Sequence, residues 1–395
     1  MIDIKNKEDC MGCYACATLC PLQCVAMESD DEGFWYPVAD SERCIQCGQC
    51  IRVCPVLGNK RTTKEDRVKP APTAYAAYNI HDEVRLSSSS GGIFRLLAEE
   101  VIDSGGVVFG AAFQDDFSVY HDYCDCVEEI ERFQGSKYVQ SRIGEAFRQA
   151  RVFLRQDRLV FFSGTPCQIS GLKHYLGQDY DNLICQDIIC HGVPSPKVWQ
   201  KYLAYRETLA GSSTTSISFR RKDIGWKQFS VSFVFRNDTE YCQIHRRDLY
   251  MMAFLKDICL RPSCYACNSK GLNRESDITL ADFWGIANVV PEMDDDRGTS
   301  LVLVHSDKGQ EFLKRVDDRI ISKEVDVQEG IRYNPAAVNS VTRHPLRDEF
   351  FSRLDHDEID KLIQKFCRDR FLVRVKRRAK SVAKTLVRKI GLLPD

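Results

Sequence analysis

The sequence predicts an α/β protein with α+β elements, in which a small cysteine-rich domain precedes a mixed α/β domain and a C-terminal amphipathic helix. Three observations support this. The first 58 residues hold two copies of one cysteine pattern. Strand and helix signals alternate from residue 73 onward, and the last residues combine an apolar helical period with basic side chains. A chain of 395 residues has room for two or three domains.

The cysteine-rich domain, residues 1–58, is a tandem repeat whose copies are offset by 34 residues. Each copy follows C-x2-C-x2-C-x3-C-P, the spacing of bacterial ferredoxins with two four-iron clusters. There the fourth cysteine of each copy ligates the other cluster. Zinc knuckles or disulfides are alternatives, and two complete copies with both prolines argue against them. We predict one [4Fe-4S] cluster on Cys10, Cys13, Cys16 and Cys54, and a second on Cys44, Cys47, Cys50 and Cys20.

The composition is that of a soluble globular protein, with 44% apolar and 28% charged residues but nineteen cysteines. The N-terminus shows no secretory signal, and no apolar run has the length of a membrane span. We therefore expect a cytoplasmic location, where a reducing environment makes cysteines metal ligands and not disulfides. The net charge of −1 combines a tail of +9 over residues 368–391 with an acidic remainder, so we expect no nucleic-acid binding.

Residues 58–72 are polar, end in Pro-Ala-Pro and are typical of a linker. Beyond them, the alternation of strands and helices predicts a sheet with parallel crossovers, divided into residues 73–165 and 166–345. A hairpin of residues 230–235 and 240–244, and a helix at 249–260, complete the prediction. We expect further strands at 74–78, 107–113, 159–162, 183–190, 277–281 and 301–304, and further helices at 93–102, 144–154, 168–176, 196–209 and 308–316.

A Ser- and Gly-rich loop, residues 87–92, lies between the first strand and the first helix of this region. Glycines let a backbone approach a phosphate closely, and the free amides at a helix N-terminus attract anions. A capped turn without a ligand is the alternative. Because neither G-x-G-x-x-G nor a Walker motif is present, an ordinary dinucleotide fold and an NTPase are not indicated.

Four later cysteines are candidates for a third [4Fe-4S] cluster. Cys167 begins a helix, a position that lowers a thiol pKa, and Cys190 follows the next strand. Ligands bind at the carboxyl ends of parallel strands, so both thiols are expected to face one pocket, where Cys264 and Cys267 complete the set. Zinc is the main rival occupant, and buried core thiols are the other alternative. Spare candidates are Cys185 and Cys259.

Other polar or reactive residues have simpler interpretations. We expect the triplet Arg220-Arg221-Lys222 to contact a cofactor phosphate, an acidic partner or only water, with a solvated face as the safer interpretation. The remaining cysteines are expected in the core: Cys24, Cys124, Cys126, Cys242 and Cys367.

Several of these motifs together resemble the coenzyme F420 hydrogenase/dehydrogenase beta-subunit family, over residues 73–345. The resemblance also includes a preceding dicluster ferredoxin unit, which is a common fusion in that family. Cys259-x4-Cys264-x2-Cys267 and Asp282-Phe-Trp-Gly285 look like a bacterial branch, in organisms not expected to make the deazaflavin. The matching motifs are Ser89-Ser90-Gly91-Gly92, Gly135-Ser136-Lys137-Tyr138, Gly164-Thr165-Pro166-Cys167-Gln168, Cys190-His191-Gly192, Cys264-x2-Cys267 and Asp277-Ile-Thr279.

The resemblance implies a flavin-binding domain. Members bind FAD and Fe–S clusters and pass electrons between the clusters and a hydride-accepting molecule, coenzyme F420 in the type member. Cys167, Cys190, Cys264 and Cys267 would hold a cluster beside the flavin. No catalytic residue is assigned, and His191 is the nearest candidate by position. The implied flavin-site residues are Ser89, Ser90, Gly91, Gly92, Gly135, Ser136, Lys137, Tyr138, Gly164, Thr165 and Pro166.

The sequence thus predicts an iron–sulfur flavoprotein oxidoreductase. Its partners would be a soluble electron donor, such as ferredoxin or a redox partner subunit, and a small-molecule substrate such as coenzyme F420 or another organic compound. The alternatives are a non-catalytic electron-relay subunit and an interaction protein that has lost the chemistry. The basic tail within residues 346–395 repeats apolar residues at intervals of three and four, so it is expected to contact an anionic inner membrane surface or to pack on the body or a partner.

Overall fold

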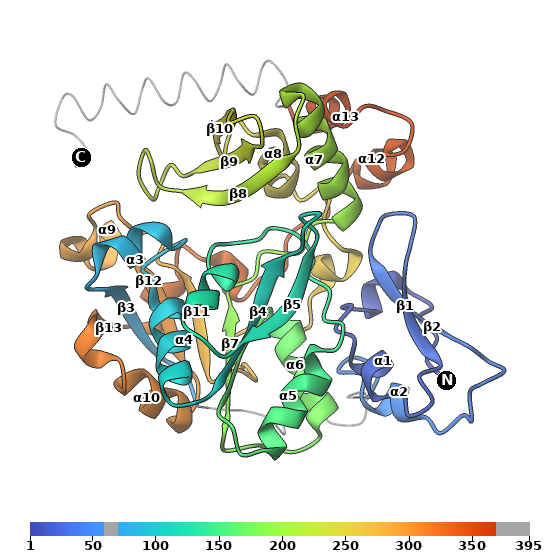
Figure 1. Ribbon diagram of the computed structural model, residues 1–395, viewed down its shortest axis with the longest axis horizontal. Coiled ribbons are helices and arrows are strands. Elements are labelled where there is room, and N and C mark those ends of the chain that lie inside the picture. Colours follow the sequence, from blue (N-terminus) through green and yellow to red (C-terminus); the bar gives the residue numbers. More distant parts are fainter. Residues whose placement is uncertain (59–69, 369–395) are drawn as a thin grey trace.

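The computed structural model describes residues 1–58 and 70–368 (Figure 1). Most of the linker predicted at 58–72 and the amphipathic part of the basic tail, residues 369–395, lie outside the described residues. Within the described ranges, no helix has the length and apolarity needed to cross a membrane.

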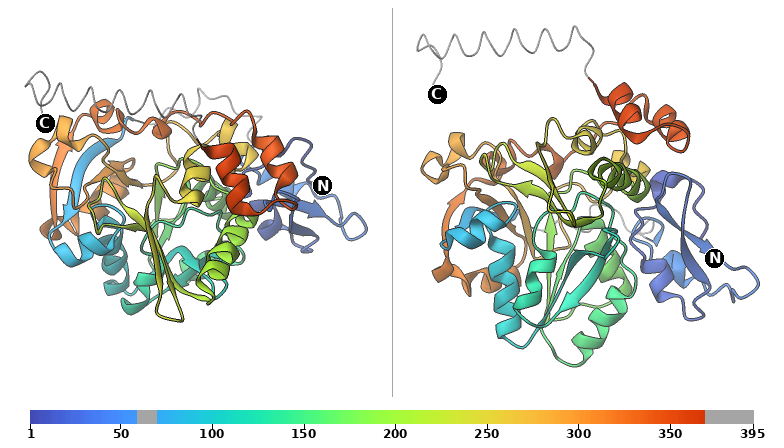
Figure 2. Two further views of the ribbon diagram at one scale, coloured as in Figure 1. Left: turned by 90° about the horizontal axis from the view of Figure 1, so that it is seen from above. Right: turned by 45° about the horizontal axis from the view of Figure 1, so that its top comes forward.

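The N-terminal residues form a compact ferredoxin-like unit at one end of the molecule (Figures 1 and 2). Two short helices, α1 and α2, pack against each other, and an antiparallel hairpin joins β1 to β2 with Val25 opposite Ala39. The bounds are α1 Ala15–Leu19, β1 Val25–Ser29, β2 Trp35–Ala39 and α2 Gln49–Arg52.

An eight-stranded mixed sheet forms the centre of the larger part, in the order β13-β3-β12-β11-β7-β6-β4-β5. Four neighbouring strands, β11, β7, β6 and β4, are parallel, and all other pairs are antiparallel. The bounds are β3 Thr73–Asn79, β4 Val107–Phe113, β5 Val119–Cys124, β6 Val160–Ser163, β7 Leu183–Ile188, β11 Ile278–Asp282, β12 Ser300–Val304 and β13 Ile320–Val325.

Helices cover both faces of this sheet. On one face α4 (Ile93–Asp103) and α10 (Asp307–Lys314) pack in the core that contains Phe161. On the other, α5 (Ala146–Arg155) and α6 (Pro166–Leu176) pack in the core that contains Phe162 and reaches the ferredoxin-like unit. Strands buried on both sides read as nearly continuous apolar runs, which explains the sequence of β6. Three shorter helices complete this part: α3 Asp82–Ser87, α9 Ile286–Val289 and α11 Val327–Ile331.

A three-stranded antiparallel sheet, β10-β9-β8, lies on the side of the large sheet where its parallel strands end (Figure 2). Its core is aromatic, with Trp199 fully buried at the centre, and helices α7, α8, α12 and α13 contribute to the same core. The bounds are α7 Pro196–Ala210, β8 Thr214–Arg221, β9 Ser230–Phe235, β10 Glu240–Ile244, α8 Leu249–Leu255, α12 Arg347–Arg353 and α13 Ile359–Cys367.

The loop between β1 and β2 fastens the ferredoxin-like unit to the rest of the chain. Ser195 Oγ donates to the carbonyl of Glu32, and Lys197 Nζ donates to the carbonyl of Asp31 over 2.8 Å. The Glu32 carboxylate accepts two bonds, of 2.8 and 2.5 Å, from buried Arg347. At Gly33, φ is +87° and an added Cβ would lie 2.4 Å from the Cβ of Lys197, so only glycine fits.

The structure confirms most predicted elements and corrects three. The prediction of parallel crossovers holds only for β4, β6, β7 and β11, because antiparallel strands flank them on both sides. The helix predicted to reach residue 260 ends at Leu255, with Asp257 in the left-handed region. The loop at residues 87–92 does not follow a strand directly, since α3 lies between. The boundaries proposed for the domains remain predictions.

Candidate cluster and cofactor sites

The cysteines of the N-terminal repeats line two separate cavities in the crossed pattern expected from their spacing. The cavity nearer the large domain is lined by Cys10, Cys13, Cys16 and Cys54, and we call it the proximal cavity. The other, the distal cavity, is lined by Cys20, Cys44, Cys47 and Cys50. The fourth cysteine of each copy therefore lies with the first three of the other copy.

A fifth thiol lies at the distal cavity. Cys24 lines it as well, and its Sγ lies 3.4 Å from Sγ of Cys20. Cys24 is buried, as the prediction of core packing requires, and it also lines a candidate cluster site. The turn after Pro21 brings the two sulfurs together, since Gln23 takes a left-handed conformation there.

Four thiols from distant parts of the chain line a third cavity, the central cavity. Cys167 stands in the first turn of α6, whose N-terminus carries a capping box between Thr165 and Gln168. Cys190 follows the end of β7, and Cys264 and Cys267 lie on a turn of 3₁₀ helix and just after it. The predicted convergence at the carboxyl ends of β6 and β7 is therefore present in the fold.

Burial dominates the acidity of the thiols at the central cavity. It raises the pKa of Cys167, Cys190 and Cys264 to about 12 each, with neighbouring thiols adding to the shift. The lowered pKa expected for Cys167 at a helix start is therefore wrong, because desolvation outweighs the helix position. Thiols gathered in this way ionise only when a bound cation compensates the charge.

The donor set of each of the three cavities consists of at least four thiols, the ligand type of an iron–sulfur cluster. Among residues 1–58 and 70–368, no three His, Cys, Asp or Glu side chains are arranged to hold one metal ion. Each of the three cavities instead leaves space between at least four thiols. Thiolates are the ligands of [4Fe-4S] clusters, and four of them complete one cluster. The two spare candidates do not line the central cavity: Cys185 and Cys259 are both fully buried elsewhere.

A much larger cavity, of about 680 Å³, lies between the large sheet and the three-stranded sheet. Its volume is in the range of sites for drug-sized ligands and cofactors. Its lining includes the ends of β6, β7 and β11 on one side and residues of β8 and α8 on the other. Most of the residues predicted for a flavin site line it: Ser89, Ser90, Gly92, Gly135, Ser136, Lys137, Tyr138, Gly164 and Thr165.

Two predicted residues lie just outside this lining. Gly91 packs under the loop, where an added Cβ would stand 2.5 Å from the carbonyl oxygen of Ala77. Its amide donates to Ser300 Oγ over 2.9 Å, so it positions the loop against β12. Pro166 lines the central cavity instead of the large one.

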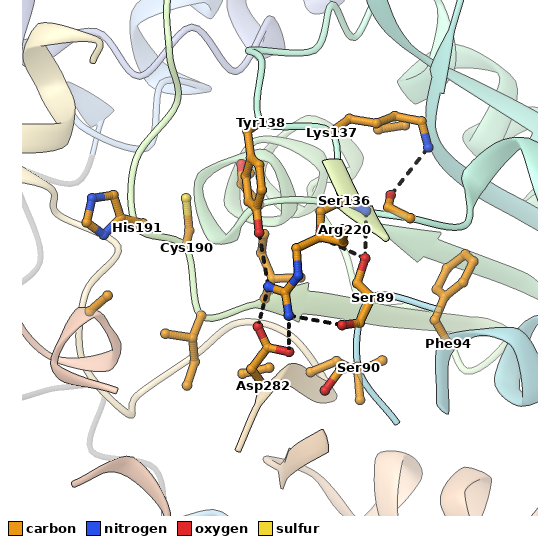
Figure 3. A pocket seen from close by; sticks show the side chains of 18 of the residues that line it. Ser89, Ser90, Phe94, Ser136, Lys137, Tyr138, Cys190, His191, Arg220 and Asp282 are labelled. Carbon is orange, nitrogen blue, oxygen red and sulfur yellow. Dashed lines mark hydrogen bonds and ion pairs between the residues drawn. The ribbon is translucent and has the colours of Figure 1, made fainter. Parts of the chain in front are cut away.

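The two loops that carry predicted cofactor residues are bonded to each other (Figure 3). Ser89 Oγ accepts a bond of 2.8 Å from the amide of Ser136 and lies 2.9 Å from its hydroxyl oxygen. Arg220, from β8, donates to the carbonyl of Ser89 over 3.0 Å and to Tyr138 Oη over 3.2 Å. These bonds hold both loops on one side of the cavity.

Arg220 is buried and forms a two-bond ion pair with Asp282 at 2.7 and 3.0 Å (Figure 3). A solvated face is the safer interpretation of the triplet from sequence, and burial of Arg220 corrects it. Arg221 is partly exposed and pairs with Asp223 and Glu240. Lys222 Nζ donates to three backbone carbonyls, including that of Ser90, and burial lowers its pKa to about 7.

The start of α4 offers backbone donors to this cavity. Gly92 is the N-cap residue, in the left-handed region with φ +82°, and no side chain caps the amides that follow. Ile93 and Phe94, the first helical residues, line the cavity. Uncapped amides at a helix N-terminus favour an anionic group such as a phosphate.

Burial lowers the pKa of two basic side chains of the cavity. Burial lowers the pKa of His121 to about 4, although its Nε2 lies 3.1 Å from the carbonyl of Ser163. Burial also lowers the pKa of Lys137 to about 7, and its Nζ donates to the carbonyl of Gln134. His191, the acid–base candidate by position, is bound through Nε2 to Asp257 at 2.6 Å.

The four cavities form a row. Cys190, His191, Gly192 and Val193 line both the large and the central cavity. Met11 lines both the central and the proximal cavity. Cys16 and Cys50, from the proximal and distal cavities, belong to one buried core between α1 and α2. The order along the row is therefore distal, proximal, central and large.

Sequence reasoning missed His121 and the exposure of some cysteines. His121 sits within β5, where the consecutive polar residues His121 and Asp122 gave no clear strand signal. Cys124 and Cys367 are buried as predicted, but Cys126 is only partly buried and Cys242 is exposed on β10, contrary to the core prediction.

Family models match two parts of the chain. Residues 157–329 match the family model for the C terminus of the coenzyme F420 hydrogenase/dehydrogenase beta subunit. Residues 9–57 match a 4Fe-4S dicluster domain, and residues 36–84 match a second model of that description.

Among curated proteins, the chain is similar to NADH-quinone oxidoreductase subunit I 2 of Geobacter metallireducens, at 37% identity over 62 residues. It is similar to subunit I of Pelobacter propionicus at 37% identity over 58 residues. These matches cover 14% and 13% of this chain, and 47% and 31% of the relatives, so the chain spans less than half of either.

Among solved structures, the chain resembles one from the F420-reducing [NiFe] hydrogenase complex of Methanosarcina barkeri. The TM-score is 0.45 and the identity 16%, over 77% of this chain and 94% of that one. A likeness at this level is too weak to support a conclusion about function.

Proposed function

Because the chain joins a 4Fe-4S dicluster domain to the C-terminal domain of the coenzyme F420 hydrogenase/dehydrogenase beta-subunit family, we propose that it is an iron–sulfur flavoprotein oxidoreductase. It would carry two [4Fe-4S] clusters in the distal and proximal cavities, a third in the central cavity and FAD in the large cavity. Clusters exchange single electrons, whereas a flavin also exchanges a hydride equivalent with an organic substrate.

One observation carries this proposal: the central thiol cavity and the large cavity share the wall from Cys190 to Val193. A site for one-electron carriers therefore adjoins a site large enough for an organic cofactor. Cys167, Cys190, Cys264 and Cys267 would be the central ligands. The N-terminal ligands would be Cys10, Cys13, Cys16 and Cys54 for the proximal cluster, and Cys20, Cys44, Cys47 and Cys50 for the distal one.

The residues of the large cavity supply what FAD needs from a protein. The uncapped amides after Gly92 would bind the pyrophosphate, and the loop of Ser89 and Ser90 beside them would fix its position. Tyr138, held by Arg220, would line the ring site beside Gly164 and Thr165. Phe94 and Phe254 add apolar surface to the lining of the cavity.

The organic substrate would enter the same cavity from the side of the three-stranded sheet. Lys227, His245 and Arg246 line that side, where Lys227 pairs with Asp294 at 2.6 Å and Arg246 supplies a further positive charge. An acidic small molecule, coenzyme F420 or another anionic hydride acceptor or donor, suits this lining. No residue is assigned here as the acid or base.

Iron and flavin quantification after anaerobic purification tests the whole scheme. We expect about twelve irons and one FAD per chain. About eight irons without flavin would favour the alternative, a relay subunit that passes electrons to a separate catalytic protein. The redox partner would be a soluble ferredoxin-type donor or another subunit, which would dock at the distal cavity, where Cys47 is exposed.

The proposed location is the cytoplasm, with contact to an anionic membrane surface through the basic tail at residues 369–395. Sedimentation with vesicles of zwitterionic or anionic lipid tests this contact. The full chain should bind the anionic vesicles, and a chain that ends near Asp369 should not. Equal binding by both chains would rule out the tail as the anchor.

A further inference from the structure

Arg261 is a fully buried cation that has no acidic partner within the described chain. Its three bonds all go to neutral oxygens. Nε donates to the carbonyl of Cys10 over 2.9 Å, one terminal nitrogen to Gln140 Oε1 over 3.2 Å, and the other to the carbonyl of Trp35 over 3.0 Å. A buried charge normally requires a partner of opposite charge.

The other buried arginines show how this protein meets that requirement. Each of these five arginines forms an ion pair with a carboxylate, as Arg220 does with Asp282 and Arg347 with Glu32. The remaining pairs are Arg85–Asp295, Arg206–Asp248 and Arg274–Asp187. Among residues 1–58 and 70–368, Arg261 is the exception.

Aromatic rings lessen the cost of this burial without removing it. The guanidinium lies 4.3 Å from the ring centroid of Tyr36 and 5.5 Å from that of Phe34. Such contacts stabilise a desolvated cation. The desolvation penalty of a buried ion exceeds what such contacts return, so the rings and carbonyls leave most of the charge uncompensated.

The position of Arg261 indicates where its counter-charge lies. It lines the central cavity, together with all four of the thiols gathered there. On its other side it bonds to the backbone of Cys10, which lines the proximal cavity. The arginine therefore stands between two candidate cluster sites.

We infer that the guanidinium of Arg261 is the counter-charge of an anionic iron–sulfur cluster held by four thiolates in the central cavity. Through its bond to the carbonyl of Cys10, the same guanidinium also contacts the proximal site. The inference rests on the proposed function, because it presupposes the central cluster. A cluster bound by four thiolates is an anion that gains one negative charge on reduction, and its potential depends on nearby charge. A fixed cation beside it favours the reduced form and raises the potential.

Lys270 lines the same cavity and donates to the carbonyls of Cys190 and Ala336. It has no carboxylate partner within the described ranges either, so it adds positive charge. Arg274 also lines the cavity, but its charge is balanced by Asp187 at 3.2 Å. Arg261 is the member of this group that is fully enclosed, and its effect on the potential should therefore be the least screened by water.

The test is a redox titration of the anaerobically purified full chain, followed by EPR spectroscopy, with iron content measured in parallel. In Arg261→Gln we expect either loss of the four central irons alone, or a more negative potential of the central cluster. The expected shift in its reduction equilibrium is tenfold or more, which is about 59 mV for one electron. Arg261→Lys, which keeps the charge, should shift it less than tenfold.

Arg347→Gln is the matched control. It removes another buried arginine that also holds the N-terminal unit, but Arg347 already has Glu32 as its partner. It should weaken the fold and leave the central potential unchanged. The inference is overturned if Arg261→Gln retains all three clusters with an unshifted potential, or if Arg347→Gln shifts the potential equally.

Two further outcomes separate the inference from its premise. If Arg261→Gln does not fold, a tenfold or larger shift in Arg261→Lys contradicts the inference by itself. If the wild-type chain contains only about eight irons, the central cluster does not exist and the proposed function fails together with the inference. With about twelve irons in the wild type, only the behaviour of the variants decides.

Discussion

Gly171 packs directly against Cys13. A Cβ added to Gly171 would stand 2.8 Å from Cβ and 3.1 Å from Sγ of Cys13. Gly171 lies one turn beyond Cys167 on α6, so a single helix contacts the proximal cavity at one point and the central cavity at another.

Gly171→Ala should therefore destabilise the protein, although alanine is the better helix former. The gain in helix propensity is about 1 kcal/mol, while overpacking a close contact costs about 1–3 kcal/mol. We expect a net loss in the midpoint of anaerobic chemical unfolding and a perturbed EPR signal of the proximal cluster. Val152→Ala, at an exposed position of α5, is the control, and an unchanged EPR signal in Gly171→Ala would contradict the expected contact.

Cys190→Ser should remove the central cluster and leave the two N-terminal clusters. The iron content is expected to fall from about twelve to about eight per chain. Cys185→Ser is the matched control, because Cys185 lies in the preceding strand, β7, but does not line the central cavity. Equal iron loss in both variants would mean that the effect comes from damage to the sheet.

Asp282→Asn should weaken flavin binding and stability together. It leaves buried Arg220 without its carboxylate, and breaking such a pair costs about 3–5 kcal/mol. Arg220 also holds the carbonyl of Ser89, so the loop of Ser89 is expected to loosen. FAD content and thermal unfolding are the measurements.

Arg221→Gln is the control for this variant, since it breaks only partly exposed pairs with Asp223 and Glu240. Such pairs contribute about 1 kcal/mol or less. Normal FAD content in Asp282→Asn would show that the ion pair does not position the loop.

His121 should make stability depend on pH below 6.5. Burial lowers its pKa from 6.5 to about 4, so the folded protein binds fewer protons there than the unfolded chain. The free energy of unfolding therefore keeps its full value above pH 6.5. It decreases by roughly 3 kcal/mol as the pH falls toward 4. Chemical unfolding at several pH values under anaerobic conditions measures it.

His121→Phe should flatten this dependence, because phenylalanine does not titrate. It can keep the stacking that His121 makes on Phe162, with 5.6 Å between the ring centroids. His356→Gln, at an exposed position, should leave the dependence as in the wild type. The same slope in His121→Phe as in the wild type would assign the pH dependence to other groups.

The N-terminal sites were predictable because their information is local. Four cysteines within eleven residues, repeated once, leave few ways for thiols to surround a cavity, and the crossed pairing follows from the repeat. The central cavity needed one further rule: Cys167 and Cys190 follow neighbouring parallel strands, and such strands end at the same edge of a sheet. Sequence order alone brings neither of them to Cys264.

The residues that were missed depend on contacts between distant segments. Arg261 stands between two cysteines of a motif, and nothing in the motif indicates that its guanidinium reaches Cys10 and Trp35. The place of Cys24 at the distal cavity depends on the turn after Pro21, which the cysteine spacing does not specify. The strands β5 and β13 carry charged residues and pair antiparallel with β4 and β3, so the period typical of buried parallel strands does not reveal them.

The loop from Asp30 to Phe34 has a consequence for engineering. Ser195, Lys197 and Arg347 all bind its backbone or its carboxylate, and Gly33 fits only against Lys197. The N-terminal unit is therefore not an interchangeable module. A chimaera that carries the cysteine repeats of another ferredoxin should assemble correctly only when this loop is transplanted with its sequence intact.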